Sequence, residues 1–350
     1  MCFLIKEDLS MSSPVLHSCP AITRYEHNPV LTSQEVPYAS TLVFNAGVIK
    51  WKGQYVMVFR NDYNHVQQAR FEGTNIGICF SPDGIHWEVS PKVCFDIRDK
   101  ALEAKFDVPA GEITRCYDPR LTVIEDEVYM TFAVDTKHGL RGGIAKTTDF
   151  ENWEILSLTV PDNRNMVLFP EKINGKYVRL ERPMPVYSRG RDRFDMWMSE
   201  SPDMIYWGNA KLVSAVEDFN YTNDKVGPGA PPVKTDKGWL VFTHGVDIDP
   251  ERGKNGWEDT WKKRYCAGMV LLDLQDPSKV IGVYRDPLLA PETEYEAVDG
   301  FRTNVIFPTG AILEDDGTVK VYYGAADTVI ALATADVNEL VNLCLAGGPR

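Results

Sequence analysis

Short apolar stretches alternate with turn residues along most of the chain, a pattern typical of strands rather than of long helices. Residues 48–59 and 121–132 each read as an apolar strand, a tight turn and a second apolar strand. Further turns fall at Asn174-Gly175, Lys237-Gly238 and Asp316-Gly317. Because Asn-Gly and Asp-Gly between alternating strands are strong hairpin signals, the pattern predicts five β-hairpins in succession.

A second phrase, a turn that ends in an aromatic residue, interleaves with the hairpins. Clear copies occupy residues 81–87, 148–153 and 201–207, and weaker copies occupy 272–277 and 333–337. The combined repeat of about 50–80 residues suits a propeller blade of four strands with insertions. We therefore predict an all-β fold, a single-domain five-bladed β-propeller. A two-domain β-sandwich protein is the alternative, but it does not require one phrase five times.

The repeats also divide the chain. Residues 1–40 precede them and are predicted to form an N-terminal arm that packs on the rim or on a neighbouring subunit, which favours a homo-oligomer. Residues 41–345 are predicted to form the propeller itself. The charged, Gly-containing segment 249–261 is predicted to be a loop insertion in the fourth blade.

The composition narrows the classes of partner. The formal net charge of −13 argues against nucleic acid or an anionic membrane as the main partner. The N-terminal apolar stretch is too short for a signal peptide, and no run of about 18 apolar residues predicts a membrane span. The seven Cys, an odd number without a CxxC motif, are typical of reduced thiols and give no zinc-type spacing. We therefore expect a cytoplasmic protein without a metal or an organic cofactor.

The second strand of each hairpin ends in a polar phrase. These phrases place Arg60, Arg182 and His244 at comparable levels in three blades. Scattered surface charges would not need to share a register. In a chain with an excess of acidic residues, such a cluster of basic side chains indicates a binding site at the mouth of the propeller channel.

The first strands of the hairpins share a register too, and Asp118 is the polar exception among them. It takes a place where two other blades carry Phe169 and Phe307. A carboxylate in a place suited to Phe is expected to be partly desolvated, which raises its pKa and suits a general acid. The alternative is an Asp that caps its turn through backbone N–H groups. The pattern alone does not choose between the two.

Several motifs, in the same order, resemble glycoside hydrolase family 130. The resemblance runs from about residue 28 to about residue 340, nearly the whole chain. It implies a five-bladed propeller that acts on β-mannosides, mostly by inverting phosphorolysis that yields α-mannose 1-phosphate. The motifs are Tyr117-Asp118-Pro119-Arg120, Phe59-Arg60-Asn61-Asp62, Leu180-Glu181-Arg182-Pro183, Lys225-Val226-Gly227-Pro228-Gly229 and Thr243-His244-Gly245.

The resemblance also implies roles for individual residues. Asp118 matches the catalytic acid, whose proton is relayed to the glycosidic oxygen through the 3-hydroxyl of the mannosyl unit. Inorganic phosphate is then a co-substrate and the nucleophile, so no second carboxylate is needed as a base. The implied phosphate-binding residues are Arg164, Arg182, Lys225, His244 and Tyr265.

Sugar recognition calls for amides and carboxylates that bind vicinal hydroxyls and for aromatic rings beneath the sugar. Tyr117 is expected to stack on the sugar, with a role in the core as its alternative, and Asp299 to contact the phosphate or the sugar. The expected substrate-binding residues are Asn45, Arg60, Asn61, Asp62, Tyr117, Asn165 and Asp299.

The run from Asp299 to Gly310 resembles the subgroup of the family that acts on 4-O-β-D-mannosyl-D-glucose. The expected activity is therefore that of a hexosyl-transferring glycoside phosphorylase, which converts this disaccharide and phosphate to α-D-mannose 1-phosphate and D-glucose. A β-1,4-mannooligosaccharide phosphorylase is the first alternative. A β-mannoside hydrolase would lack the basic cluster, and a non-catalytic glycan-binding propeller would leave Asp118 without a purpose.

Overall fold

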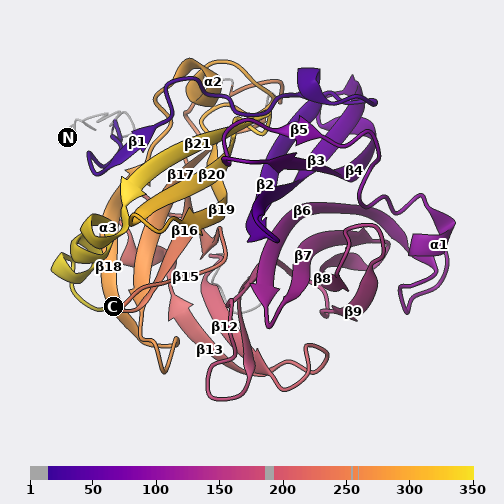
Figure 1. Ribbon diagram of the computed structural model, residues 1–350. Coiled ribbons are helices and arrows are strands. Elements are labelled where there is room, and N and C mark those ends of the chain that lie inside the picture. The colour runs from indigo at the N-terminus through magenta and orange to yellow at the C-terminus, as the bar shows by residue number, and fades with distance from the viewer. Residues whose placement is uncertain (1–14, 186–192, 254, 259) are drawn as a thin grey trace, which may run out of the picture.

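Five antiparallel sheets surround a central axis as the blades of a β-propeller in the computed structural model (Figure 1). The structure describes residues 15–185, 193–253, 255–258 and 260–350. This arrangement confirms the predicted all-β, five-bladed propeller. None of the helices in these ranges combines the length and the apolarity that crossing a membrane requires.

Each blade starts at the axis with its innermost strand and continues outward. The first three blades are β2 (Leu42–Trp51), β3 (Gln54–Gln67), β4 (Arg70–Ser81) and β5 (Glu88–Val89); β6 (Ile113–Ile124), β7 (Glu127–Thr136), β8 (Gly139–Thr147) and β9 (Glu154–Leu158); and β10 (Asn163–Leu168), β11 (Tyr177–Pro183), β12 (Met196–Ser201) and β13 (Gly208–Ser214). The fourth has β14 (Lys225–Pro228) and β15 (Val233–Lys234), both paired with β16 (Trp239–Ile248), then β17 (Lys263–Leu272) and β18 (Val280–Leu289). The fifth is β19 (Ile306–Leu313), β20 (Thr318–Ala325), β21 (Val329–Asp336) and β1 (Ile22–Arg24). The helices are α1 (Lys100–Glu103), α2 (Glu294–Ala297) and α3 (Val337–Ala346).

Local hydrogen bonds explain why the turn phrase recurs. The three clear copies connect the third strand of a blade to the fourth. In each copy an aspartate, Asp83, Asp149 or Asp203, accepts two backbone N–H groups of the turn. These contacts satisfy donors that would otherwise be lost between strands, so the phrase forms the same turn wherever it occurs.

The N-terminal segment closes the ring by supplying the outer strand of the fifth blade. In β1, Ile22 lies opposite Ala335 of β21. Arg24 donates to both carboxylate oxygens of Glu296, at 2.8 and 2.9 Å, and the Glu296 side chain is fully buried. Residues 1–14 of the predicted arm lie outside the described residues. The predicted loop insertion connects β16 to β17.

Breaking the Arg24–Glu296 pair is expected to loosen this closure. Arg24→Ala leaves a buried carboxylate without its cation, which costs about 3 kcal/mol of unfolding free energy. Urea unfolding followed by fluorescence measures the loss. The control is Lys234→Ala, which breaks the ion pair with Glu171 between side chains that are 52% and 45% exposed. We expect the control to change stability by less than about 0.5 kcal/mol, and equal losses in the two variants would contradict the closure.

Candidate active site

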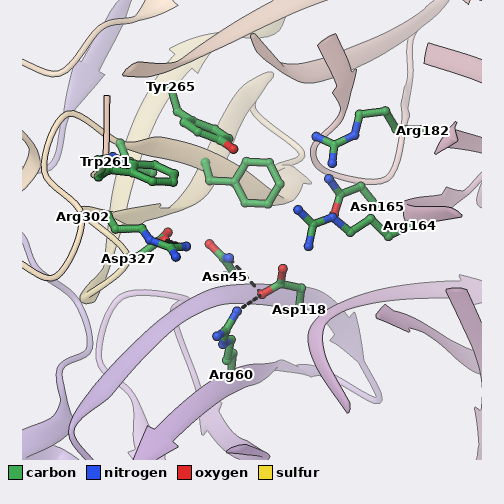
Figure 2. Close-up of a pocket in the computed structure, with 12 residues that line it drawn as sticks. Asn45, Arg60, Asp118, Arg164, Asn165, Arg182, Trp261, Tyr265, Arg302 and Asp327 are labelled. Atoms are coloured by element: carbon green, nitrogen blue, oxygen red, sulfur yellow. Dashed lines mark hydrogen bonds and ion pairs between the residues drawn. The ribbon is translucent and has the colours of Figure 1, made fainter. Parts of the chain in front are cut away.

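A cavity with about 480 Å³ of space, open solvent at its entrance included, lies at one mouth of the central channel, and all five blades contribute to it (Figure 2). Most of the lining is polar or aromatic, with arginines on both sides. The lining residues are Asn45, Arg60, Asp118, Arg164, Asn165, Arg182, Trp261, Tyr265, Arg302, Val305, Phe307 and Asp327.

Three of these side chains reach the cavity from the same backbone irregularity. In β2, β6 and β10, a β-bulge sets two residues opposite a single residue of the neighbouring strand. The first bulged residues are Asn45, Asp118 and Asn165, with φ of 52°, 54° and 57°. Asn and Asp enter this left-handed region more readily than other residues with a side chain, which explains their presence here.

The counterpart of Asp118 in the third blade is therefore Asn165. The prediction that Asp118 takes the place of Phe169 is wrong, because the bulge in β10 falls before Val167. Asp118 thus belongs to a series of polar side chains that face the channel, and it does not replace a Phe.

The charges around Asp118 decide its ionisation. Its Oδ1 accepts hydrogen bonds from Asn45 at 3.0 Å and from Arg60 at 3.3 Å, and its other oxygen points into the cavity (Figure 2). Burial alone raises the pKa of Asp118, but the guanidinium groups of Arg60, Arg120 and Arg164 and the Asn45 amide together hold it below its usual value. The prediction of a raised pKa is therefore wrong for this arrangement, because nearby positive charge outweighs desolvation.

Arg60 is fixed by residues behind the cavity wall. Its Nε and NH2 donate to the two carboxylate oxygens of Asp62 at 3.0 and 2.7 Å. Thr74 donates to Asp62 at 2.6 Å, and the Tyr117 ring lies 4.7 Å from the guanidinium carbon. Asp62 and Tyr117, which the sequence predicts to bind substrate, contact Arg60 in the structure and do not line the cavity.

Arg164 and Arg182 form a basic wall on one side of the cavity and face each other across β10 and β11. Within the described ranges, Nε and NH2 of Arg182 and Nε of Arg164 are buried and have no hydrogen-bond partner. Burial, together with repulsion by Arg164, lowers the pKa of Arg182 to about 9. Buried donors and positive charge without acceptors are the features of an anion site.

His244 supports this wall from behind. It is fully buried, with Nε2 at 2.8 Å from NH1 of Arg182 and Nδ1 at 3.2 Å from the carbonyl oxygen of Pro228. Burial and the charge of Arg182 hold the pKa of His244 well below its usual value. The neutral ring therefore donates from Nδ1 to Pro228 and accepts at Nε2 from Arg182, which orients the guanidinium.

Lys225 adds a second basic group behind the wall. Its ammonium group is paired with Asp224 and lies 4.5 Å from the centre of the Phe194 ring. Burial, followed by repulsion from Lys263, lowers the pKa of Lys225 to about 7. An anion placed near Arg182 would favour the protonated form of Lys225, and the positive charge of this ammonium group would then attract the anion further.

The structure brings together about half of the predicted site. Asn45, Arg60, Asp118, Arg164, Asn165, Arg182 and Tyr265 line the cavity. Asn61, Asp62, Tyr117, Lys225 and His244 are buried behind the lining, where Asn61 donates to Ala39 and Asn75. Asp299 is exposed on the loop after α2 and does not line the cavity.

Five residues line the cavity that the sequence did not predict as site residues: Trp261, Arg302, Val305, Phe307 and Asp327. Asp327 carried a signal, because it ends the polar phrase of the fifth hairpin. Trp261 lies within the insertion between β16 and β17, where no repeat marks it. No group of three or more His, Cys, Asp or Glu in the described segments is arranged to hold a metal ion.

Comparison with known proteins identifies relatives of this chain among mannoside phosphorylases. The family model of glycoside hydrolase family 130, described as beta-1,4-mannooligosaccharide phosphorylase, matches residues 17–346. A beta-1,4-mannooligosaccharide phosphorylase of Ruminococcus albus is 35% identical over 92% of this chain and 90% of its own. A 4-O-beta-D-mannosyl-D-glucose phosphorylase of Bacteroides fragilis is 29% identical over 95% of this chain and 87% of its own. A solved beta-1,2-mannobiose phosphorylase from Listeria innocua superimposes with a TM-score of 0.77, at 27% identity over 93% of this chain and 99% of its own.

Inorganic phosphate is expected to raise the thermal unfolding midpoint, because its oxygens accept hydrogen bonds from the unpartnered arginine donors and its negative charge offsets that of the basic wall. With phosphate at a hundredfold excess over its dissociation constant, the stabilisation is about 2.7 kcal/mol. Arg182→Met keeps the bulk but removes the donors, and the rise should disappear. Arg98→Met, at a side chain that is 59% exposed, is the control and should keep the rise. A rise of equal size in the Arg182 variant would contradict the anion site.

Proposed function

The chain belongs to glycoside hydrolase family 130, a family of mannoside phosphorylases, and from that premise we propose that it cleaves β-1,4-linked mannosides by inverting phosphorolysis. An oxygen of inorganic phosphate forms a bond to C1 of the terminal mannosyl unit while the bond from C1 to the glycosidic oxygen breaks. The glycosidic oxygen takes up a proton that starts on Asp118. The products are α-D-mannose 1-phosphate and a sugar shortened by one unit.

The buried, unpartnered donors of Arg164 and Arg182 carry this proposal. A phosphate dianion accepts hydrogen bonds from guanidinium groups in pairs, and it is already a nucleophile. Inverting hydrolysis instead needs a carboxylate base that activates water on the face opposite the acid. A basic wall is the wrong environment for such a base, so it favours phosphorolysis over hydrolysis.

Phosphate also bears on the proton that the acid must deliver. The pKa of Asp118 lies below its usual value because of surrounding guanidinium groups, Arg164 among them. A dianion on the basic wall offsets these positive charges, and the pKa of Asp118 rises as a result. We propose that Asp118 acquires its proton once phosphate is bound and passes it through the mannosyl 3-hydroxyl to the glycosidic oxygen.

The mannosyl unit is proposed to lie between the basic wall and Asp118. Asn45 and Asn165 flank the acid on the neighbouring blades and offer amides to its hydroxyls. Asp327 is a further acceptor at the opposite side from Arg182 (Figure 2). Burial raises the pKa of Asp327, although Arg302 and Arg60 act against this.

For the leaving sugar, we propose mannose or a mannooligosaccharide. The family model and the R. albus relative support this choice better than the expected mannosyl-glucose, whose B. fragilis relative is 29% identical. Mannosyl-glucose stays the second candidate. The homo-oligomer and the cytoplasmic location stay predictions.

A substrate panel tests the proposal directly. Purified protein is incubated with β-1,4-mannobiose, β-1,2-mannobiose or 4-O-β-mannosyl-glucose, with and without phosphate, and mannose 1-phosphate is quantified. We expect β-1,4-mannobiose to be consumed fastest and only with phosphate, with the α anomer as the initial product by NMR. Sugar release at the same rate in phosphate-free buffer would refute phosphorolysis.

The pH profile tests the role of Asp118. Its proton is lost as pH rises, so turnover should fall on the alkaline side, and saturating phosphate should move this limb to higher pH because the bound dianion raises the pKa. At the pH optimum of the wild type, Asp118→Asn should lose on the order of 10³-fold in kcat, and its profile should lack this alkaline limb. Its phosphate-induced rise in unfolding midpoint should persist, which shows that folding and the basic wall are intact. Near-normal turnover in this variant would remove Asp118 from its role.

A further inference from the structure

Four aromatic rings at the rim of the cavity take no part in the chemistry described above. This rim cluster consists of His65, Phe71, Trp257 and Phe301. The ring centroids lie 5.0 Å apart for His65 and Trp257, 5.5 Å for Trp257 and Phe301, and 5.4 Å for Phe71 and Phe301. Blade one, the β16–β17 connection and the loop before β19 each contribute, so the cluster depends on the assembled propeller.

Trp257, like His65, is an exposed member of the rim cluster. Its exposed fraction is 42%, whereas that of Phe301 is 3%. The planes of His65 and Phe301 are inclined to the indole by 56° and 82°. Neither ring therefore lies flat on Trp257, and part of its surface is open to solvent.

The backbone around Trp257 holds the ring in a defined place. Its N–H donates to the carbonyl oxygen of Phe301 at 2.8 Å. Gly256 has φ of 91°, and a Cβ there would lie 2.3 Å from the same oxygen, so this approach requires glycine. The side chain of Asn255 is buried and accepts from Thr303 at 2.6 Å. An exposed ring fixed in this way is pre-organised for binding, because little freedom is lost when a ligand arrives.

The rim cluster is continuous with the cavity lining. Arg302 follows Phe301 in the chain, and its guanidinium carbon lies 4.5 Å from the Trp261 ring. Glu258, the neighbour of Trp257, accepts from Nε of Arg302 at 2.5 Å. These contacts connect the segment that carries Trp257 to the side of the cavity that Trp261 and Arg302 line.

The proposed reaction fixes the direction in which a substrate extends. The basic wall of Arg164 and Arg182 lies on one side of the cavity, and Trp261 and Arg302 lie on the other (Figure 2). Inversion places the attacking phosphate and the leaving sugar on opposite faces of C1. The leaving sugar then points away from the basic wall, toward Trp261 and the rim cluster.

We propose that Trp257 is a binding platform for the third sugar of a β-1,4-mannooligosaccharide, counted from the nonreducing end. The first two sugars occupy the cavity, and the apolar C–H face of the third packs on the indole. This inference rests on the proposed function and adds a preference for substrates longer than a disaccharide.

Chain-length kinetics test the platform. The readout is the ratio of kcat/KM for β-1,4-mannotriose to that for β-1,4-mannobiose, measured in saturating phosphate. In the wild type we expect a ratio of about ten, the size of effect that one aromatic contact has on binding. Trp257→Leu should bring the ratio close to one, while Trp257→Phe should keep most of it. Tyr206→Ala is the matched control, since Tyr206 is 73% exposed but lies in the turn at residues 201–207, away from the mouth.

The outcomes separate this inference from the function on which it rests. Absence of phosphate-dependent cleavage of every mannoside would refute the proposed function. Cleavage of mannobiose and mannotriose with equal kcat/KM in the wild type, or an unchanged ratio in Trp257→Leu, would overturn the platform alone. The second measurement is the molar mass of the wild type and of Trp257→Leu in solution, determined by light scattering. Dissociation of an oligomer in Trp257→Leu would mean that a second copy of the chain covers the ring, which also overturns the platform.

Discussion

In three neighbouring blades, two residues of the innermost strand face one residue of the next strand, and this mismatch puts Asn45, Asp118 and Asn165 into left-handed backbone. Along a regular strand, side chains alternate between the two faces of the blade and pack against the neighbouring blades. The bulges interrupt this alternation and direct three polar side chains to the channel instead. The Asp118 carboxylate and the Asn45 and Asn165 amides therefore depend on a local irregularity of a highly regular fold.

The charges of the cavity follow from what these bulges bring together. Arg182 is buried and Arg60 and Arg164 are partly buried, so water screens their fields poorly, and each acts on Asp118 and would act on a ligand. The groups that attract phosphate are then the same groups that keep the acid ionised. On the proposed function, phosphate is the nucleophile, and its binding is also required before Asp118 becomes protonated. This double requirement would limit wasteful hydrolysis while phosphate is scarce.

The sequence predicts the features that short-range chemistry controls. The turns carry their own hydrogen bonds, as Asp83 shows, and their repetition is visible without a structure. The shared level of Arg60 and Arg182 was also predictable, since each pairs with the residue before a bulge. The bulges themselves leave no mark in the apolar pattern, so Asp118 was compared with the wrong residue. Its pKa depends on guanidinium groups from other strands and blades, and their positions are set only by assembly.

The closure of the ring by β1 has a consequence for how the protein is made. Ile22 pairs with Ala335, so the outer strand of the fifth blade joins the two ends of the chain. At typical rates of translation, the ribosome needs roughly 15–60 s to pass from one to the other. During that time the first strand has no partner within its own chain, while the four complete blades are already available to fold. The final blade can form only after Ala335 has been synthesised, so the last step in the assembly of the propeller is also the step that fixes its earliest residues in place.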